Sequence, residues 1–115
     1  MNARRIHTLM REHFPVINTV EHEWINVADT EGLCEAKFQD LLNHFFESAE
    51  LLVEVHRRVG KALPMSEVAG FVSAHLGQGQ IQIADRNFTS FAVVAVNGVA
   101  TAWAKPRTEA GGHNA

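Results

Sequence analysis

Residues 88–104 read FTSFAVVAVNGVATAWA, and this stretch decides the fold class. Asn-Gly between apolar runs is the strongest short-range signal of a β-hairpin, because a type I′ turn needs positive φ at both central residues. With Asn97-Gly98 as a two-residue loop, Ala92 would lie opposite Trp103. Both faces of this hairpin are apolar, so each must be covered, by a helix of the chain or by another copy.

Further strands are expected beside this hairpin. The segment Gln-Ile-Gln-Ile alternates strictly and predicts a strand over 80–85. A stretch rich in Val, Ile and Trp predicts another over 20–27. With the hairpin strands at 90–96 and 99–105, these segments predict an antiparallel meander of three to four strands.

A long amphipathic helix is predicted over residues 31–59, capped by Asp29 or Thr30. At ~100° per residue its apolar side chains form one continuous face. They are Phe38, Leu41, Leu42, Phe45, Ala49, Leu52, Val53 and Val59. Shorter helices are predicted at 3–13 and 65–76, with Gly60 and Pro64 as breaks in the chain. The predicted class is therefore α+β, with the long helix and the shorter ones packed on the meander.

Length and composition place the chain among ordinary globular domains. Its 115 residues predict a single domain over 1–105, followed by a flexible tail over 106–115. No apolar run approaches the roughly 18 residues of a membrane span, and the charged N-terminal segment is unlike a signal peptide. The lone Cys34, which we expect to be buried, excludes an internal disulfide and a cysteine-based zinc site. We expect a cytoplasmic protein without membrane contact.

Charge is distributed unevenly along the chain. Residues 21–54 carry nine acids against Lys37 alone, a net charge of −8, whereas the remainder is +5. On the predicted long helix, Asp40, Glu47, Glu50 and Glu54 fall opposite the apolar face, and no lysine is spaced to pair with the first three. Unpaired like charge steers a protein toward a basic partner. The predicted partner-binding set is Asp40, Glu47, Glu50 and Glu54, with Glu21, Glu23 and Phe46 at its edge.

His44 and His56 are candidate site residues. Asp40, His44 and Glu47 follow i, i+4, i+7 spacing, which permits a metal-dependent enzyme centred on the long helix. Metal sites in helical proteins draw ligands from several helices, and no second carboxylate–histidine pair matches this one, so no metal or cofactor is predicted. His56 falls on the apolar face of the long helix and is expected to be a buried, hydrogen-bonded histidine.

Nucleic-acid binding is a further alternative. Helix 65–76 followed by the 90–105 hairpin permits a winged-helix interpretation, with Arg4, Arg5 and Arg11 as a basic N-terminal arm. A reading helix needs phosphate contacts, but helix 65–76 contains Glu67 and neither Lys nor Arg. The alternative therefore reduces to a small DNA-associated regulator that uses the arm and the hairpin.

Motifs of nucleophilic catalysis and of phosphate-binding loops are absent from the sequence. The leading hypothesis is a small non-enzymatic protein-binding domain, such as an inhibitor or immunity protein, that docks a basic partner through the acidic helix face. A homodimer through the apolar hairpin is expected if its alanine-lined face is not covered within the chain.

Overall fold

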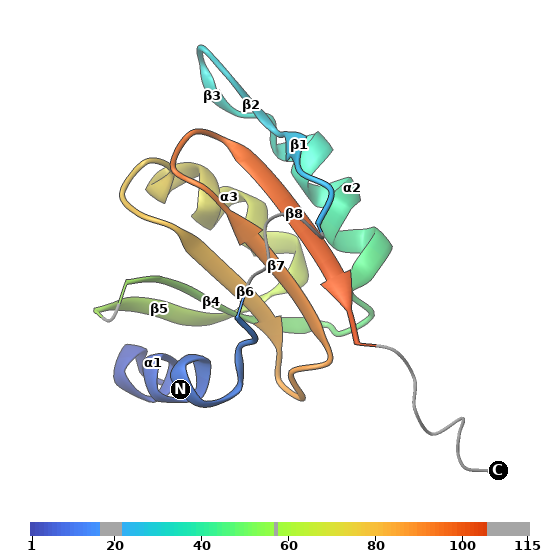
Figure 1. Ribbon diagram of the computed structural model, residues 1–115. Helices are drawn as coiled ribbons and strands as arrows, with labels where there is room; N and C mark the ends of the chain where they lie inside the picture. Colours follow the sequence, from blue (N-terminus) through green and yellow to red (C-terminus); the bar gives the residue numbers. More distant parts are fainter. Residues whose placement is uncertain (17–21, 57, 106–115) are drawn as a thin grey trace, which may run out of the picture.

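The computed structural model describes residues 1–16, 22–56 and 58–105, which form an α+β architecture with helices on both faces of an antiparallel sheet (Figure 1). The helices of this part of the chain are α1 (Ala3–His13), α2 (Glu35–Phe45) and α3 (Met65–His75). The strands are β1 (Ile25–Asn26), β2 (Ala28–Asp29), β3 (Gly32–Leu33), β4 (Glu50–His56), β5 (Val59–Pro64), β6 (Ile81–Asp85), β7 (Ser90–Val94) and β8 (Val99–Ala104). The predicted α+β class is confirmed.

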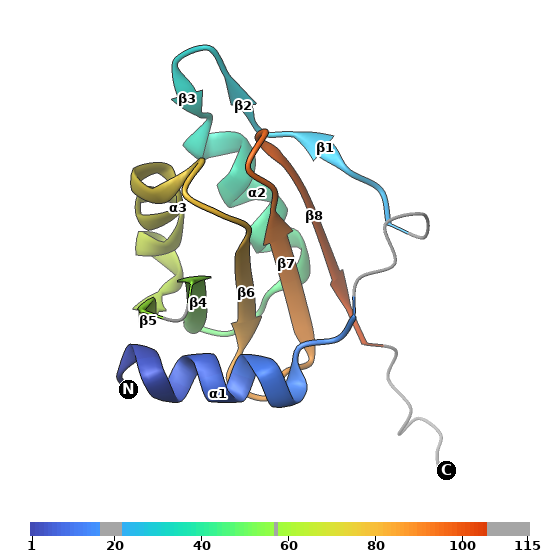
Figure 2. The same ribbon diagram turned by 60° about the vertical axis from the view of Figure 1, so that its left-hand side comes forward.

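The large sheet has six strands in the order β1-β8-β7-β6-β4-β5, and all neighbours run antiparallel. β2 and β3 pair separately as a small hairpin. The predicted meander of three to four strands is wrong in extent, because β4 and β5 continue the sheet beyond β6. Helices α2 and α3 cover one face, and α1 crosses the other (Figure 2).

The long helix predicted over 31–59 is wrong. α2 ends where Phe46 takes extended backbone angles, φ −116° and ψ 132°, and the chain then returns as β4. The five middle residues of β4 are all buried. A strand covered on both faces carries a nearly continuous apolar run, which a helical period fits as well as an alternating one. The β-branched Val53 and Val55 are the residues in this run that favour a strand.

The predicted start of that helix is also wrong. Asp29 and Thr30 lie in the β2–β3 hairpin, where the Asp29 carboxylate accepts a hydrogen bond of 2.8 Å from the Glu31 N–H. This contact is the Asx-turn that competes with a helix cap. α2 begins at Glu35, and the residue before it, Cys34, is exposed rather than buried as expected.

β5 occupies a stretch for which the sequence predicted only breaks. Pro64 ends this edge strand. Proline has no N–H to donate, and it is tolerated in an edge strand because one side of that strand has no neighbouring strand to bond. Gly60 lets α1 approach the sheet closely, since a Cβ atom at this position would lie 3.4 Å from Ile6 Cγ2. Both residues therefore suit an edge strand beneath a helix.

The β7–β8 hairpin is confirmed, but its register differs by one residue from the prediction. Ala92 pairs with Ala102, not with Trp103. The loop has three residues, 96–98, and within it only Gly98 has a positive φ, +88°. A three-residue loop with glycine in the left-handed position is the next most common hairpin connection, so the glycine is used but the type I′ turn is not.

The two shorter helices are confirmed. α1 spans the predicted residues and buries Ile6 and Met10. α3 ends one residue before its predicted end and buries Val68 and Val72. Gly77 follows with φ +91°, as expected for a residue that stops a helix in the left-handed conformation.

Two apolar cores lie on opposite faces of the sheet. The larger core lies against α2 and α3, and the smaller one lies beneath α1. Ala92 and Ala100 are buried members of the larger core, and the partly buried Ala102 packs against it, so this face is covered within the chain. This arrangement removes the reason for expecting a homodimer through the alanine-lined face of the hairpin.

Within the described residues, no helix is long and apolar enough to cross a membrane. The predicted tail over 106–115 and part of the strand predicted over 20–27 lie outside the described residues. The described remainder of that predicted strand forms only β1, and Val27 follows as a fully buried member of the larger core.

Candidate functional site

The predicted acidic helix face does not exist as one surface. Asp40 lies on α2, Glu47 follows that helix, and Glu50 and Glu54 belong to β4. Side chains alternate along a strand, so Glu50 and Glu54 share the side of Leu52, which packs in the core beneath α1. The four carboxylates are thus divided between opposite sides of the sheet.

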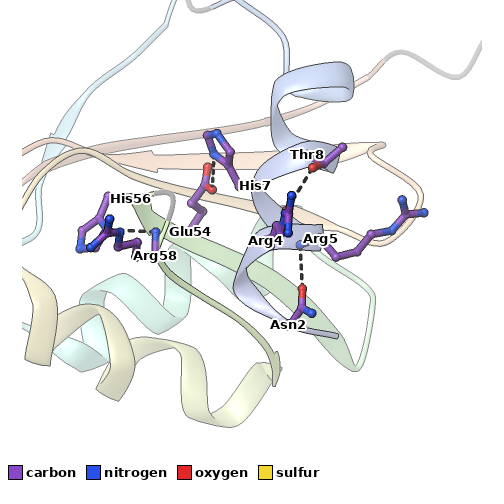
Figure 3. A network of polar contacts seen from close by, with 8 residues as sticks. All are labelled: Asn2, Arg4, Arg5, His7, Thr8, Glu54, His56 and Arg58. Atoms are coloured by element: carbon purple, nitrogen blue, oxygen red, sulfur yellow. Dashed lines mark hydrogen bonds and ion pairs between the residues drawn. The ribbon is translucent and has the colours of Figure 1, made fainter.

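Glu54 is held inside the molecule by α1. Glu54 is 7% exposed, and its Oε2 atom lies 2.8 Å from His7 Nδ1 (Figure 3). A carboxylate can only accept, so the histidine Nδ1–H donates. His7 is the sole partner of this carboxylate within the part of the chain that the structure describes. Glu54 is therefore not available to another protein.

Glu50 pairs with Arg86 in the turn between β6 and β7. The Arg86 Nη2 and Nε atoms both lie 2.5 Å from Glu50 Oε1. Both side chains are about half exposed, so this pair adds little stability, but it neutralises the carboxylate. The prediction that Glu50 offers unpaired charge is wrong.

Three other predicted residues fall in different places. Phe46 is 3% exposed and lies in the larger core, so its predicted place at the edge of a binding surface is wrong. Glu23 is exposed in the segment before β1, and Glu47 is exposed in the loop between α2 and β4. Glu21 lies outside the described residues.

Four exposed carboxylates lie on consecutive elements of the chain. They are Asp29, Glu31, Glu35 and Asp40, and we call them the acidic surface. The first two lie in the β2–β3 hairpin, which projects past the end of the large sheet, and the others lie on α2, which follows directly (Figure 1). None of the ion pairs formed among the described residues involves any of the four.

The base of the hairpin is fixed although its tip is exposed. Val27 donates its N–H to the Gly98 carbonyl at 2.9 Å and accepts the Cys34 N–H at 2.7 Å. Ala28 packs so close to the β7–β8 loop that a Cβ atom on Gly98 would lie 2.6 Å from the Ala28 Cβ. The acidic surface is therefore presented by a hairpin with an anchored base.

The predicted metal alternative loses its geometry. α2 ends at Phe45, so Glu47 leaves the helix that was expected to align it with Asp40 and His44. Across residues 1–16, 22–56 and 58–105, no group of three or more His, Cys, Asp or Glu side chains is placed to hold a metal ion.

His56 does not lie in a core. It is exposed at the end of β4, and its Nδ1 atom accepts a 3.2 Å hydrogen bond from the Arg58 N–H (Figure 3). The expectation of a buried histidine followed from the wrong helix assignment. The buried acid Asp85 is likewise structural, because it accepts hydrogen bonds from the N–H groups of Thr89 (2.7 Å) and Ser90 (3.2 Å) in the β6–β7 turn.

The elements proposed for a DNA-associated regulator are also placed differently. All five residues of β7 are buried, so the β7–β8 hairpin is an interior part of the sheet and not a projecting wing. Arg4, Arg5 and Arg11 are exposed, but they lie on α1, which packs on the sheet and is not a free arm.

A shallow groove lies near the acidic surface, between α2 and the start of α3. Its volume is about 580 Å³, and it is lined by Gln39, Asn43, Ala49, Pro64, Met65 and Ser66. Gln39 donates to Asn43 at 3.0 Å along α2. Its lining contains no charged side chain among the described residues.

Asp29, Glu31 and Glu35 belong to the acidic segment of the sequence, but the sequence pattern places them at the start of a helix. The short Asp-Thr-Glu-Gly stretch, which is typical of a turn, is the signal that could have placed the first two on a hairpin. Comparison of the chain with protein-family models, curated protein sequences and solved structures finds no match.

Proposed function

We propose that this chain is a non-enzymatic protein-binding domain, of the inhibitor or immunity type, that docks onto a basic surface of another protein through its acidic surface. The observation that carries this proposal is the set of four exposed carboxylates on the β2–β3 hairpin and α2. Asp40 is common to this set and to the set predicted from the sequence, whereas Glu50 and Glu54 are excluded because each makes an ion pair within the chain.

Separation of charge across the fold supports the proposal. Residues 22–49 contain six acids and a single lysine, Lys37, which is a net charge of −5 with histidines neutral. α1, on the opposite face of the sheet, carries three arginines and one glutamate. A field of this kind orients an approaching partner and suppresses wrong dockings.

The anchored hairpin base supports it as well. Binding costs free energy for every loop that must become ordered. Because Val27 and Gly98 hold the base of the hairpin against the sheet, much of that cost is already met during folding. The acidic side chains therefore start from a limited set of positions.

The test begins with identification of the partner, by crosslinking in the native host and mass spectrometry. Its affinity for the full chain is then measured by calorimetry across a range of ionic strength. We expect affinity to fall as salt rises, because exposed charges are screened within about 10 Å at 0.1 M salt. The double variant Glu31→Lys/Glu35→Lys is expected to weaken binding at least about tenfold.

Glu67→Lys is the matched control, since Glu67 is an exposed acid in the first turn of α3. It should leave affinity within about twofold of the unmodified chain. A partner whose affinity ignores both salt and the double variant would refute the proposal. Retardation of duplex DNA that is lost on Arg4→Glu would instead favour the DNA-associated alternative.

A further inference from the structure

β5 is one of the two edge strands of the six-stranded sheet, and β1 is the other. Among the described residues β5 pairs with β4 alone, from Glu50–Pro64 to His56–Val59. In Figure 2 it is the outermost strand, with the first turn of α1 beneath it. A free edge of this kind presents backbone groups that another strand can bind.

The register identifies which backbone groups face outward. Met65 donates its N–H to the Ala49 carbonyl at 2.8 Å. Because hydrogen-bonded pairs alternate along an antiparallel ladder, the backbone N–H and C=O groups of Lys61 and Leu63 also point toward β4. The N–H and C=O groups of Gly60 and Ala62 then point away from the sheet. No described residue bonds to these outward groups, and both residues are partly exposed.

The charged side chains of β5 and of the residue just before it are all basic. Residues 58–64 contain Arg58 and Lys61 and no acid. Arg4 and Arg5 are exposed in the first turn of α1, which packs against β5 through Ile6 and Gly60. The amino end of a helix adds partial positive charge of its own.

We infer that this edge, Val59–Pro64, binds an acidic extended segment of a partner protein by strand addition. Backbone hydrogen bonds to Gly60 and Ala62 supply affinity in this mode of recognition, and side chains next to the edge supply selectivity. An acidic strand places carboxylates near Lys61 and Arg58. A second copy of this chain fits less well, because an edge-to-edge pair would bring the two Lys61 side chains together, and lysine at an edge opposes such pairing.

The test uses the full chain and a blocked peptide of alternating valine and glutamate, with an alternating valine–lysine peptide for comparison. Binding is followed by nuclear magnetic resonance. We expect the acidic peptide to shift the amide signals of Gly60 and Ala62 and to slow their hydrogen exchange, while the lysine peptide does neither. Higher salt should weaken the binding.

Two variants locate the interaction. Ala62→Pro removes an outward N–H without removing a ladder bond to β4, and Lys61→Glu reverses the central charge; each should weaken peptide binding at least about tenfold. Lys37→Glu on α2 is the matched charge control and should change it by less than about twofold. If Ala62→Pro fails to fold by circular dichroism, Lys61→Glu decides alone.

The inference fails if both peptides bind equally, if neither binds, or if the amide changes appear at Ala102 and Ala104 of β8 instead. It also fails if the chain dimerises through β5 without peptide. The Glu31→Lys/Glu35→Lys variant should bind the acidic peptide as the unmodified chain does, so this result is independent of the proposed function.

Discussion

The two faces of the sheet are covered in different ways. Beneath α2 and α3 lies a core of fifteen buried apolar residues, which include side chains of both helices, of β4, β6, β7 and β8, and Val27 between β1 and β2. Beneath α1 lies a core of six. α1 therefore has less apolar area with which to hold its place, and area buried is the main source of stability.

Directional contacts make up for the smaller core under α1. His7 donates to Glu54, and Phe14, just after the helix, meets Phe91 edge-on with ring centroids 5.2 Å apart. Trp103 completes this aromatic group at 6.1 Å from the Phe14 ring. A buried ion pair adds little net stability over apolar packing, so we expect the His7–Glu54 contact to act mainly on the position of α1. We therefore expect one face to stabilise the domain and the other to position a helix on it.

Truncation of one buried side chain on each face gives the largest expected effects. Phe38 and Ile6 are both fully buried, in the larger and the smaller core. Phe38→Ala should lower the free energy of unfolding by about 3–5 kcal/mol, and Ile6→Ala should fall at the lower end of about 2–5 kcal/mol, because α1 can settle into the space. Chemical denaturation measures both. A greater loss from Ile6→Ala would reverse the comparison.

The base of the β2–β3 hairpin is held by the close approach of Ala28 to Gly98. Gly98 and Gly77 both have φ near +90°, but an added Cβ atom meets Ala28 at 2.6 Å only at Gly98 and meets nothing within 4 Å at Gly77. Gly77→Ala should cost about 1–2 kcal/mol for the left-handed backbone. Gly98→Ala should cost about 2–4 kcal/mol, because overpacking adds to that strain.

Thermal denaturation compares these two glycine variants. The Gly98→Ala chain should also show faster hydrogen exchange at the Cys34 amide, whose bond to Val27 secures the hairpin base. Equal melting temperatures for the two variants would show that Ala28 can move away at no cost.

Local signals in the sequence were enough for elements that end at recognisable residues. α1 stops before Pro15, α3 stops before Gly77, and β7 and β8 flank Asn97-Gly98. The join between α2 and β4 carries no glycine or proline. Without such a signal, the apolar residues of α2 and β4 fit one continuous helical spacing, and the pattern predicts a helix where the structure has a buried strand.

The sequence predicts how many acids this region carries, but not which of them are paired within the fold. The count of charges along residues 21–54 needs no structure, but the pairing of charges does. Glu54 meets a histidine 47 positions away, and Glu50 meets an arginine 36 positions away. Contacts at such separation are set by strand order, which local periodicity does not contain.

The smallest expected effects come from these two ion pairs, and they test the positioning role of the α1 face. His7→Ala leaves the buried Glu54 carboxylate without its partner and should cost about 1–3 kcal/mol. Arg86→Ala breaks the half-exposed pair with Glu50 and should cost less than about 1 kcal/mol.

The double variant His7→Leu/Glu54→Leu should recover most of the stability that His7→Ala loses, because apolar side chains often replace a buried pair at little cost. Urea denaturation measures all three, and hydrogen exchange along α1 reports the position of the helix. If the double variant restores stability but α1 exchanges faster, the pair positions the helix as argued. If exchange along α1 stays slow, apolar packing alone holds the helix, and the contrast between the two faces is one of size only.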